Sequence, residues 1–266
     1  MNRRDFLASS MAAGVGGGLQ AGGSMAQAQQ SSQAYFELRR YDLRVGPMTD
    51  RMHEYLKDVS LPAHNRAGVR TVGAFTPVYG GMSPAIYLLL AYPSVQELAT
   101  LASRLDADAA FRKAADAHAS LPAIDPAYLR IHSQLMAAAT FMPTVEVPPS
   151  AAGNKPRIFE LRTYESHSKR ASRKKLQMFG EMGELSIFRR TGLRPVFFGD
   201  NVIGERLPSF TYMLTFDDMA AREKNWATFI ADPEWVKLRA TEGYTDPEIV
   251  SNIASIILRP TPYSQL

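Results

Sequence analysis

The sequence contains one six-residue phrase twice, FELRRY at 36–41 and FELRTY at 159–164. Other landmarks recur at nearly the same separation, close to 124 residues: Gly68 with Gly192, Tyr87 with Tyr212, and DADAAFRKA at 106–114 with ADPEWVKLR at 231–239. Self-similarity at a constant spacing along a whole chain indicates an internal duplication. The 266 residues are enough for two domains of roughly 100–130 residues each. We therefore expect two copies of one structural unit.

Both halves show the same predicted order of elements, β-α-β-β-α-β. In the first domain, 35–141, patterning and turn residues predict strands at 35–44, 69–79, 85–92 and 127–141, and helices at 47–68 and 94–120. In the second domain, 157–260, they predict strands at 158–164, 193–203, 209–216 and 249–260, and helices at 168–190 and from Asp217 or Asp218 onward, interrupted at Asp232-Pro233. A proline-containing linker at 142–156 separates the domains. This order is typical of a ferredoxin-like unit, in which two helices cover one face of a four-stranded antiparallel sheet.

The uncovered face of each sheet decides how the two units combine. The third strand of the first half is apolar on both faces, because Leu88 and Leu90 alternate with Tyr87 and Leu89. An apolar sheet face needs a partner that excludes water. We therefore predict an α+β fold in which two tandem ferredoxin-like units pack their antiparallel sheets face to face, as an intrachain dimeric α/β barrel.

The repeated phrase also supplies the candidate binding residues. Residues alternate between the two faces of a strand, so we expect Phe36 and Leu38 to face the helices and the polar residues to point between the sheets. The polar set is Glu37, Arg39 and Tyr41 in the first half and Glu160, Arg162 and Tyr164 in the second. Buried charges must be paired, by each other, by the opposite half or by a ligand. Two interpretations stay open: an ion-pair lattice that fixes the strand register, and a pocket that binds an anionic or carbonyl-bearing small molecule.

The composition excludes several other kinds of site. The chain has no cysteine, which excludes disulfides, thiolate metal sites and a cysteine nucleophile. The five histidines show no metal-ligand spacing, and we expect no metal: they are His53, His64, His118, His132 and His167. The net charge of +4 is too small to indicate a nucleic-acid partner. The basic run at 167–175 is interpreted as a solvated helix start, with an acidic partner as the alternative, and Trp226 and Trp235 as core.

The first 28 residues are typical of a twin-arginine signal peptide. NRRDFL at 2–7 precedes an Ala/Gly-rich run, and AQA at 26–28 supplies small residues for cleavage. We expect a bacterial protein exported to the periplasm or secreted, with a mature chain that begins near Gln29. Its glycines make the leader too weakly apolar to span a bilayer, and no transmembrane helix is expected in the mature chain.

The sequence resembles the NIPSNAP family over about residues 35–260. The resemblance rests on the tandem FELRxY strands and on NRAGVRTVGAF at 65–75 and RRTGLRPVFF at 189–198, which follow the first helix of each half. It implies the dimeric α/β-barrel fold, whose ferredoxin-like units pair through their sheets. The resemblance implies no settled activity and transfers no catalytic residues, which stay unknown. Animal members are mitochondrial and connected with vesicle traffic and mitophagy signalling.

Three functions stay open on the sequence. The first is an exported NIPSNAP-like protein that binds a small ligand or a protein partner between or around its two halves. The second is a dimeric α/β-barrel enzyme, either a cofactor-free or a haem-dependent monooxygenase or isomerase. The third is an interaction module that works through homo-oligomerisation. No cofactor is predicted, but haem with one axial histidine is left open, with His64 as the best candidate and an ordinary helix-terminal histidine as the alternative.

Overall fold

The computed structural model of the chain describes residues 33–266, and the predicted signal peptide at 1–28 lies outside this range. The first half contains the elements β1 (Tyr35–Asp42), α1 (Pro47–Tyr55), the π-helical segment η1 (Leu56–Ser60), α2 (Leu61–Arg66), β2 (Val72–Tyr79), β3 (Ala85–Tyr92), α3 (Val95–Ala107), α4 (Ala109–Ala119) and β4 (Arg130–Ala138). The second half contains the 3-10 turn η2 (Pro149–Ala151), β5 (Ile158–Glu165), α5 (Lys169–Gly180), α6 (Glu184–Arg190), β6 (Arg194–Ile203), β7 (Ser209–Phe216), α7 (Met219–Ala231), α8 (Pro233–Leu238), α9 (Asp246–Ile249) and β8 (Asn252–Pro260). Both halves keep the predicted alternation of strands and helical regions.

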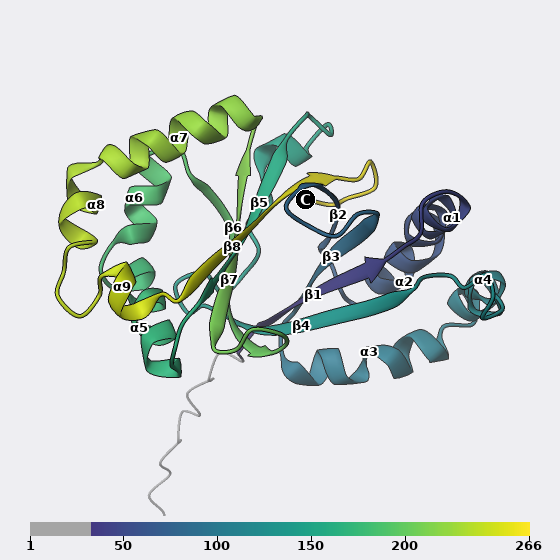
Figure 1. The fold of residues 1–266 in the computed structure, drawn as a ribbon. Helices are drawn as coiled ribbons and strands as arrows, with labels where there is room; N and C mark the ends of the chain where they lie inside the picture. Colours follow the sequence, from purple (N-terminus) through teal and green to yellow (C-terminus); the bar gives the residue numbers. More distant parts are fainter. Residues whose placement is uncertain (1–32) are drawn as a thin grey trace, which may run out of the picture. The chain divides into compact units, whose positions relative to one another are not determined.

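The strands form one closed antiparallel barrel in the order β1-β3-β2-β8-β5-β7-β6-β4 (Figure 1). Four neighbouring strands come from each half. The halves join at two seams, where β2 pairs with β8 and β4 pairs with β6. The predicted fold, two sheets facing each other within one chain, is confirmed. Closure also gives every strand of the barrel two neighbours, which removes the free sheet edges that promote aggregation.

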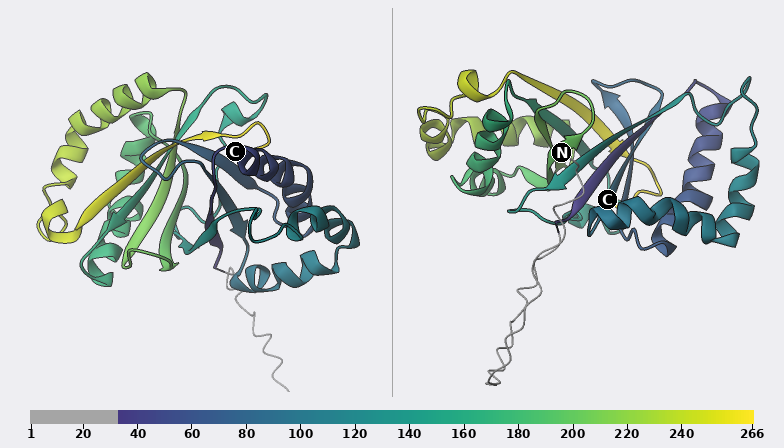
Figure 2. Two further views of the ribbon diagram at one scale, coloured as in Figure 1. Left: turned by 45° about the vertical axis from the view of Figure 1, so that its right-hand side comes forward. Right: turned by 90° about the horizontal axis from the view of Figure 1, so that it is seen from below.

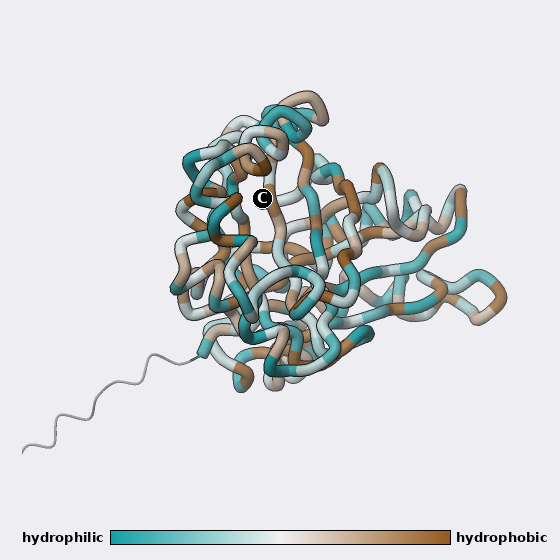
Figure 3. The backbone as a smooth tube through the Cα atoms, turned by 60° about the vertical axis from the view of Figure 1, so that its left-hand side comes forward, coloured by the Kyte–Doolittle hydropathy of each residue, from teal (hydrophilic) through white to brown (hydrophobic). Residues whose placement is uncertain are grey.

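Two groups of helices cover the barrel from opposite sides. Helices α1 to α4 lie on the side of the first half's strands and α5 to α9 on the side of the second half's strands (Figures 1 and 2). Hydrophobic and hydrophilic residues are interspersed along the strands (Figure 3), as expected where each strand faces two different layers. Hydrophobic cores accordingly lie inside the barrel and under each helix group.

Aromatic side chains from both halves meet inside the barrel. Phe36 packs against Phe197 with ring centroids 5.4 Å apart, and Phe75 packs against Phe159 at 4.9 Å, both edge to face. All four rings are buried. Full burial of a phenylalanine side chain contributes about 1.5–3 kcal/mol. These contacts join the first half to the second, so the interior stabilises the closed arrangement of the two sheets.

The predicted orientation of the opening strands is wrong. On β1, Phe36 belongs to the barrel interior and Leu38 packs against it, whereas Glu37, Arg39 and Tyr41 face the helices. A period of two specifies which residues share a face, but not which layer that face meets. The aromatic and aliphatic residues fill the barrel, and the charged residues find hydrogen-bond partners in the layer between sheet and helices. Residues 159–164 of β5 show the same reversal.

The strand register corrects one of the repeat landmarks. Arg39 lies opposite Leu88 of β3, and Arg162 lies opposite Tyr212 of β7. The structural counterpart of Tyr212 is therefore Leu88. Tyr87 belongs to the barrel interior, so it shares a residue type with Tyr212 but not a face of the sheet.

The second predicted helix of each half is divided at an aspartate. Asp108 caps α4 and Asp232 caps α8 through their side chains. Each also pairs with an arginine, Asp108 with Arg66 at 2.7 Å and Asp232 with Arg190 at 2.6 Å. The duplication thus extends to these breaks. The predicted helix at 168–190 is divided as well, into α5 and α6, at the left-handed Gly183.

Candidate functional site

A fully paired carboxylate lies on the outer face of β1. Arg39 donates from Nε to Glu37 Oε1 at 2.9 Å and from Nη2 to Oε2 at 3.0 Å. Ser133 of β4 donates to Oε1 at 2.7 Å, and Tyr92 of β3 donates to Oε2 at 3.0 Å. Burial opposes ionisation of Glu37, but the charge of Arg39 and these hydrogen bonds together lower its pKa. The predicted pairing of Glu37 with Arg39 is confirmed, and the pair is ionised at neutral pH.

A cavity of about 460 Å³ lies between this ion pair and helix α3. The helix contributes apolar lining: Leu98, Leu101, Ala102 and Leu105. The strands contribute Glu37, Arg39, Tyr92 and Ser133, and Ile203 from β6 of the second half completes the lining on one side. Three of the lining residues are exposed, Ala102, Ser133 and Ile203, so the cavity opens to solvent. Its volume falls within the range of about 300–1,000 Å³ that is usual for small-molecule sites.

His64 of α2 also lines the cavity, with 4% of its surface exposed. Its Nδ1 lies 2.7 Å from the Ser60 carbonyl oxygen. Because a carbonyl only accepts, Nδ1 carries the hydrogen and Nε2 keeps a free lone pair. Nε2 has no hydrogen-bond partner and is shielded from solvent. Burial, assisted by Arg39, lowers the pKa of His64, so the ring is neutral at pH 7.

The matching carboxylate of the second half is covered by helix α7. Arg162 donates to Glu160 Oε1 at 2.8 Å, and Ser255 of β8 donates to the same atom at 2.8 Å. Arg222 of α7 makes two further bonds, to Oε2 at 2.9 Å and to Oε1 at 2.6 Å, and Trp226 Nε1 donates to Oε2 at 2.8 Å. Burial opposes ionisation of Glu160, but these hydrogen bonds and the charge of Arg162 lower its pKa to about 2.

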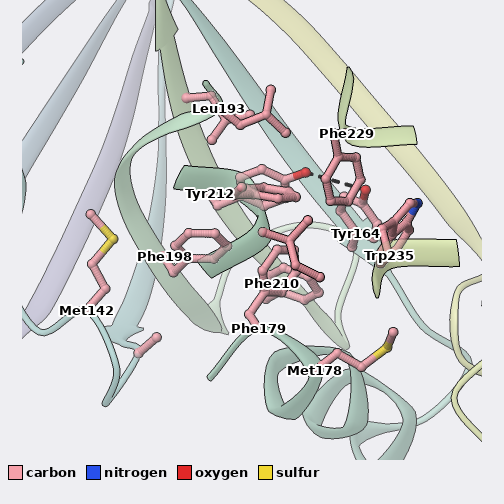
Figure 4. Close-up of a cluster of buried hydrophobic side chains, with 14 of the residues drawn as sticks. Met142, Tyr164, Met178, Phe179, Leu193, Phe198, Phe210, Tyr212, Phe229 and Trp235 are labelled. Carbon is pink, nitrogen blue, oxygen red and sulfur yellow. Dashed lines mark hydrogen bonds between the residues drawn. The ribbon is translucent and has the colours of Figure 1, made fainter. Parts of the chain in front are cut away.

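Aromatic rings fill the layer around this second pair. The indole of Trp226 lies over the Arg162 guanidinium, 4.6 Å from ring centroid to Cζ. The ring centroid of Tyr164, on β5, lies 5.5 Å from Cζ of the same guanidinium. The Tyr212 hydroxyl donates a hydrogen bond to the Tyr164 hydroxyl at 3.4 Å (Figure 4). Phe188 of α6 packs edge to face on Trp226 at 5.8 Å. Glu160 is fully buried as a result.

The duplication relates the two environments position by position. Helices α3 and α7 each have 13 residues and begin after a capping side chain, Ser94 or Asp218, at an offset of 124. At that offset the second half has the larger residue at three positions that line the first-half cavity: Arg222 for Leu98, Trp226 for Ala102 and Phe229 for Leu105. Phe188 likewise stands for His64, four residues before the paired glycines. The cavity exists because the first half has smaller side chains on its helices.

The structure brings the predicted site residues together as two separate sets. Glu37 and Arg39 hydrogen-bond each other beside Tyr41, and Glu160, Arg162 and Tyr164 form the matching set. Each set lies under its own helices, and none of these residues lies between the sheets.

The sequence interpretation missed the partners of these sets. They are Tyr92 and Ser133 in the first half and Arg222, Trp226 and Ser255 in the second. Trp235 is buried core as predicted, but Trp226 is half-buried and hydrogen-bonds Glu160. The sequence signal that could have indicated the difference between the two halves is the contrast between Ala102 and Trp226 at matched positions.

The basic run at 167–175 is only partly a solvated helix start, because Lys175 is buried. Its Nζ lies 3.3 Å from Glu184 Oε2 and over the rings of Tyr164, Phe179 and Trp235. Burial raises the pKa of Glu184 to about 7 against the opposing charge of Lys175. The counterparts of this pair in the first half are Arg51 and Ser60, at an offset of 124.

Haem does not fit the residues of the first-half cavity. An axial histidine needs a free Nε2 lone pair, which His64 has, and an approach for the iron to that atom, which its shielding from solvent denies. Within residues 33–266 no cluster of three or more histidine, aspartate or glutamate side chains is placed to hold a metal ion. Over the same range, no helix combines the length and apolar character needed to cross a bilayer.

The comparisons with known proteins agree with this architecture. The NIPSNAP family model matches twice, at residues 36–143 and 159–265, and no curated protein is significantly similar to the chain. A candidate monooxygenase from Lactobacillus acidophilus NCFM superposes with a TM-score of 0.56 at 8% identity, over 86% of this chain and 94% of that one. A second, from Fusobacterium nucleatum subsp. nucleatum ATCC 25586, has a TM-score of 0.54 at 7% identity, over 86% and 93%.

A smaller relative matches one half of the chain. An uncharacterized NIPSNAP-like domain protein from Burkholderia xenovorans is 23% identical over 41% of this chain and 88% of its own, with a TM-score of 0.36. At these identities the two monooxygenase-like neighbours show the fold alone, and the family rests on the double match of the family model. Since that model covers most of both halves, the chain belongs to the NIPSNAP family.

Proposed function

We propose that the chain binds a neutral small molecule in the first-half cavity, between the outer face of β1 and helix α3. The observation that carries this proposal is a 460 Å³ space, lined by apolar residues of α3 on one side and by Arg39 and His64 on the other, with Ala102 among its exposed lining residues. The equivalent layer of the second half is filled by side chains. We propose binding for Glu37 and Arg39, which line the cavity, and a supporting role for Tyr41, whose hydroxyl accepts from Arg39. For Glu160, Arg162 and Tyr164 we propose a structural role.

The charges around the cavity favour a neutral ligand over an anion. Glu37 already balances the charge of Arg39 at 2.9 Å, and His64 is neutral. A bound anion would therefore add a partly buried charge without a counterion, which is unfavourable. Of the two ligand classes that the sequence left open, the charge balance supports the carbonyl-bearing one. An enzyme of monooxygenase or isomerase type would use this same cavity.

Native mass spectrometry of protein purified from the compartment where it accumulates tests the proposal. The wild-type chain is expected to retain a small molecule that Ala102→Trp lacks, because a tryptophan side chain at this lining position is expected to occupy part of the cavity. Ala99→Trp, at an exposed position on the same helix, is the matched control and should retain it. A wild-type protein that retains nothing, and whose melting temperature responds to no neutral carbonyl compound in a panel, would contradict the proposal.

We also propose export by the twin-arginine route. The support is the pattern of residues 2–7 and 26–28, which lies outside the described range. Replacing Arg3 and Arg4 together by lysine should keep the chain in the cytoplasm of a bacterial host, as judged by cell fractionation and by retention of the uncleaved leader. Equal amounts of both forms in the periplasm would rule this route out.

A further inference from the structure

In the second half, a side chain of the chain itself, Trp226, occupies the position that corresponds to the open cavity of the first half. Trp226 of α7 lies over the Arg162 guanidinium at 4.6 Å, and its Nε1 donates to Glu160 Oε2 at 2.8 Å. Its counterpart on α3 is Ala102, which ends at Cβ and is an exposed lining residue of the cavity. The first half therefore lacks a planar ring at the position where the second half supplies one.

The guanidinium of Arg39 is arranged to receive such a ring. Its Nε and Nη2 are engaged by Glu37, and its Nη1 lies 3.4 Å from the Tyr41 hydroxyl, so its edge is largely in use. Within residues 33–266 no aromatic ring covers Arg39 at a stacking distance, whereas Arg162 has two, Tyr164 and Trp226. Arg39 lines the cavity with its side chain partly exposed, and the flat face of a guanidinium attracts the π-face of an aromatic ring.

The hydrogen bond that Trp226 donates to Glu160 in the second half has an equivalent in the first half. Tyr92 donates to Glu37 Oε2, the same oxygen position to which Trp226 donates on Glu160. The occupant therefore need not donate a hydrogen bond to Glu37. Leu98 replaces Arg222, which removes a positive charge and presents an apolar surface instead.

We infer that the first-half cavity takes a planar, neutral aromatic molecule whose ring stacks on Arg39 as Trp226 stacks on Arg162. This inference rests on the proposed binding function and names the class of ligand. The aromatic ring is held between the guanidinium face and the apolar residues Leu98, Leu101 and Leu105 of α3. The chain would thus have replaced an external ring by its own tryptophan in one half and kept the site open in the other.

Three probes of similar size test the inference by isothermal titration calorimetry. They are 2-acetylnaphthalene, which is planar and neutral, its fully saturated decahydro analogue, which is neutral but not planar, and 2-naphthoate, which is planar but anionic. The naphthyl ketone is expected to bind at least ~5-fold more tightly than the saturated ketone, the size of a cation–π contact, and more tightly than the anion. Ala102→Trp should lower the affinity for the naphthyl ketone at least ~10-fold, and Ala99→Trp should leave this affinity unchanged.

The outcomes separate the inference from the function on which it rests. Equal binding of the planar and saturated ketones, both blocked by Ala102→Trp, overturns the stacking inference and keeps the cavity as a binding site. Tighter binding of 2-naphthoate overturns the assignment of a neutral ligand. No binding of any probe, or binding that Ala102→Trp leaves unchanged, overturns the inference and the proposed site together. Thermal unfolding of each variant shows that it has folded.

Discussion

The two halves of the barrel use one strand motif in two different settings. Glu37 and Arg39 border a cavity that opens to solvent, whereas Glu160 and Arg162 lie beneath Arg222 and Trp226. The strand residues are the same in both halves, and the helix residues above them differ. The ion pair alone therefore does not make a site. The site arises where the neighbouring helix has side chains too small to cover the pair.

The largest expected difference between the halves concerns the buried carboxylates. Glu160→Ala removes the partner of two arginines, Arg162 and Arg222, and should lower the free energy of unfolding by about 3–5 kcal/mol. Glu37→Ala leaves only Arg39 unpaired, next to a cavity that admits water, and should cost about 1–3 kcal/mol. Urea unfolding of both variants measures the difference. Equal losses would show that the cover from α7 adds nothing to the second pair.

The pH dependence of stability should also distinguish the halves, because only the second has the Lys175–Glu184 pair. The pKa of Glu184 is raised to about 7 in the fold from an ordinary 4.5, so its contribution is fully present below pH 4.5 and is lost as the pH rises toward 7.

Glu184→Gln should flatten the pH dependence between pH 4.5 and pH 7. Ser60→Ala, at the matching first-half position, should leave the slope as it is in the wild type. Denaturant unfolding at several pH values gives both slopes. If Glu184→Gln keeps the wild-type slope, then another group causes it.

Opening the second half should create a second site. Trp226→Ala removes a half-buried ring and is expected to cost about 2 kcal/mol. It also exposes the face of Arg162, so the calorimetric stoichiometry for 2-acetylnaphthalene should rise from one to two per chain. A stoichiometry that stays at one, with the fold intact, would mean that the two layers differ by more than their occupant.

The smallest expected difference concerns the two serines that donate to the carboxylates. Ser133→Ala should cost about 1 kcal/mol, because Glu37 then keeps Arg39 and Tyr92 alone. Ser255→Ala should cost less, because Glu160 keeps Arg162, Arg222 and Trp226. Thermal unfolding of the two single variants compares them, and the reverse order would contradict this account of the pairs.

Much of the fold follows from the sequence because a duplication repeats its signals. The predicted strands at 85–92 and 209–216 coincide with β3 and β7, and the facing of the two sheets is confirmed. The orientation of the opening strands could not be predicted, because alternation along FELRRY fits either layer equally well. The register error at Tyr87 has a similar origin, since matching letters at an offset of 125 hid a change of face.

The candidate site was predictable only on its strand side. Glu37 and Arg39 follow from the repeated phrase, and their pairing follows from the cost of burying a charge. The helix side depends on which residues of α3 and α7 lie over the strands, and that requires the packing of the fold. The pair Ala102 and Trp226 was visible in the sequence, but a difference in size acquires meaning only once both are known to lie above an arginine.

Because the barrel closes within one chain, residues of its two halves can be substituted independently. In a barrel assembled from two identical chains, every substitution occurs twice, so a tryptophan that fills one pocket fills the other as well. Here β2 with β8 and β4 with β6 join halves that are encoded separately. One half can therefore fill the layer between its sheet and helices with side chains while the other half keeps an open cavity. A substitution in one half does not impose the same substitution on the other.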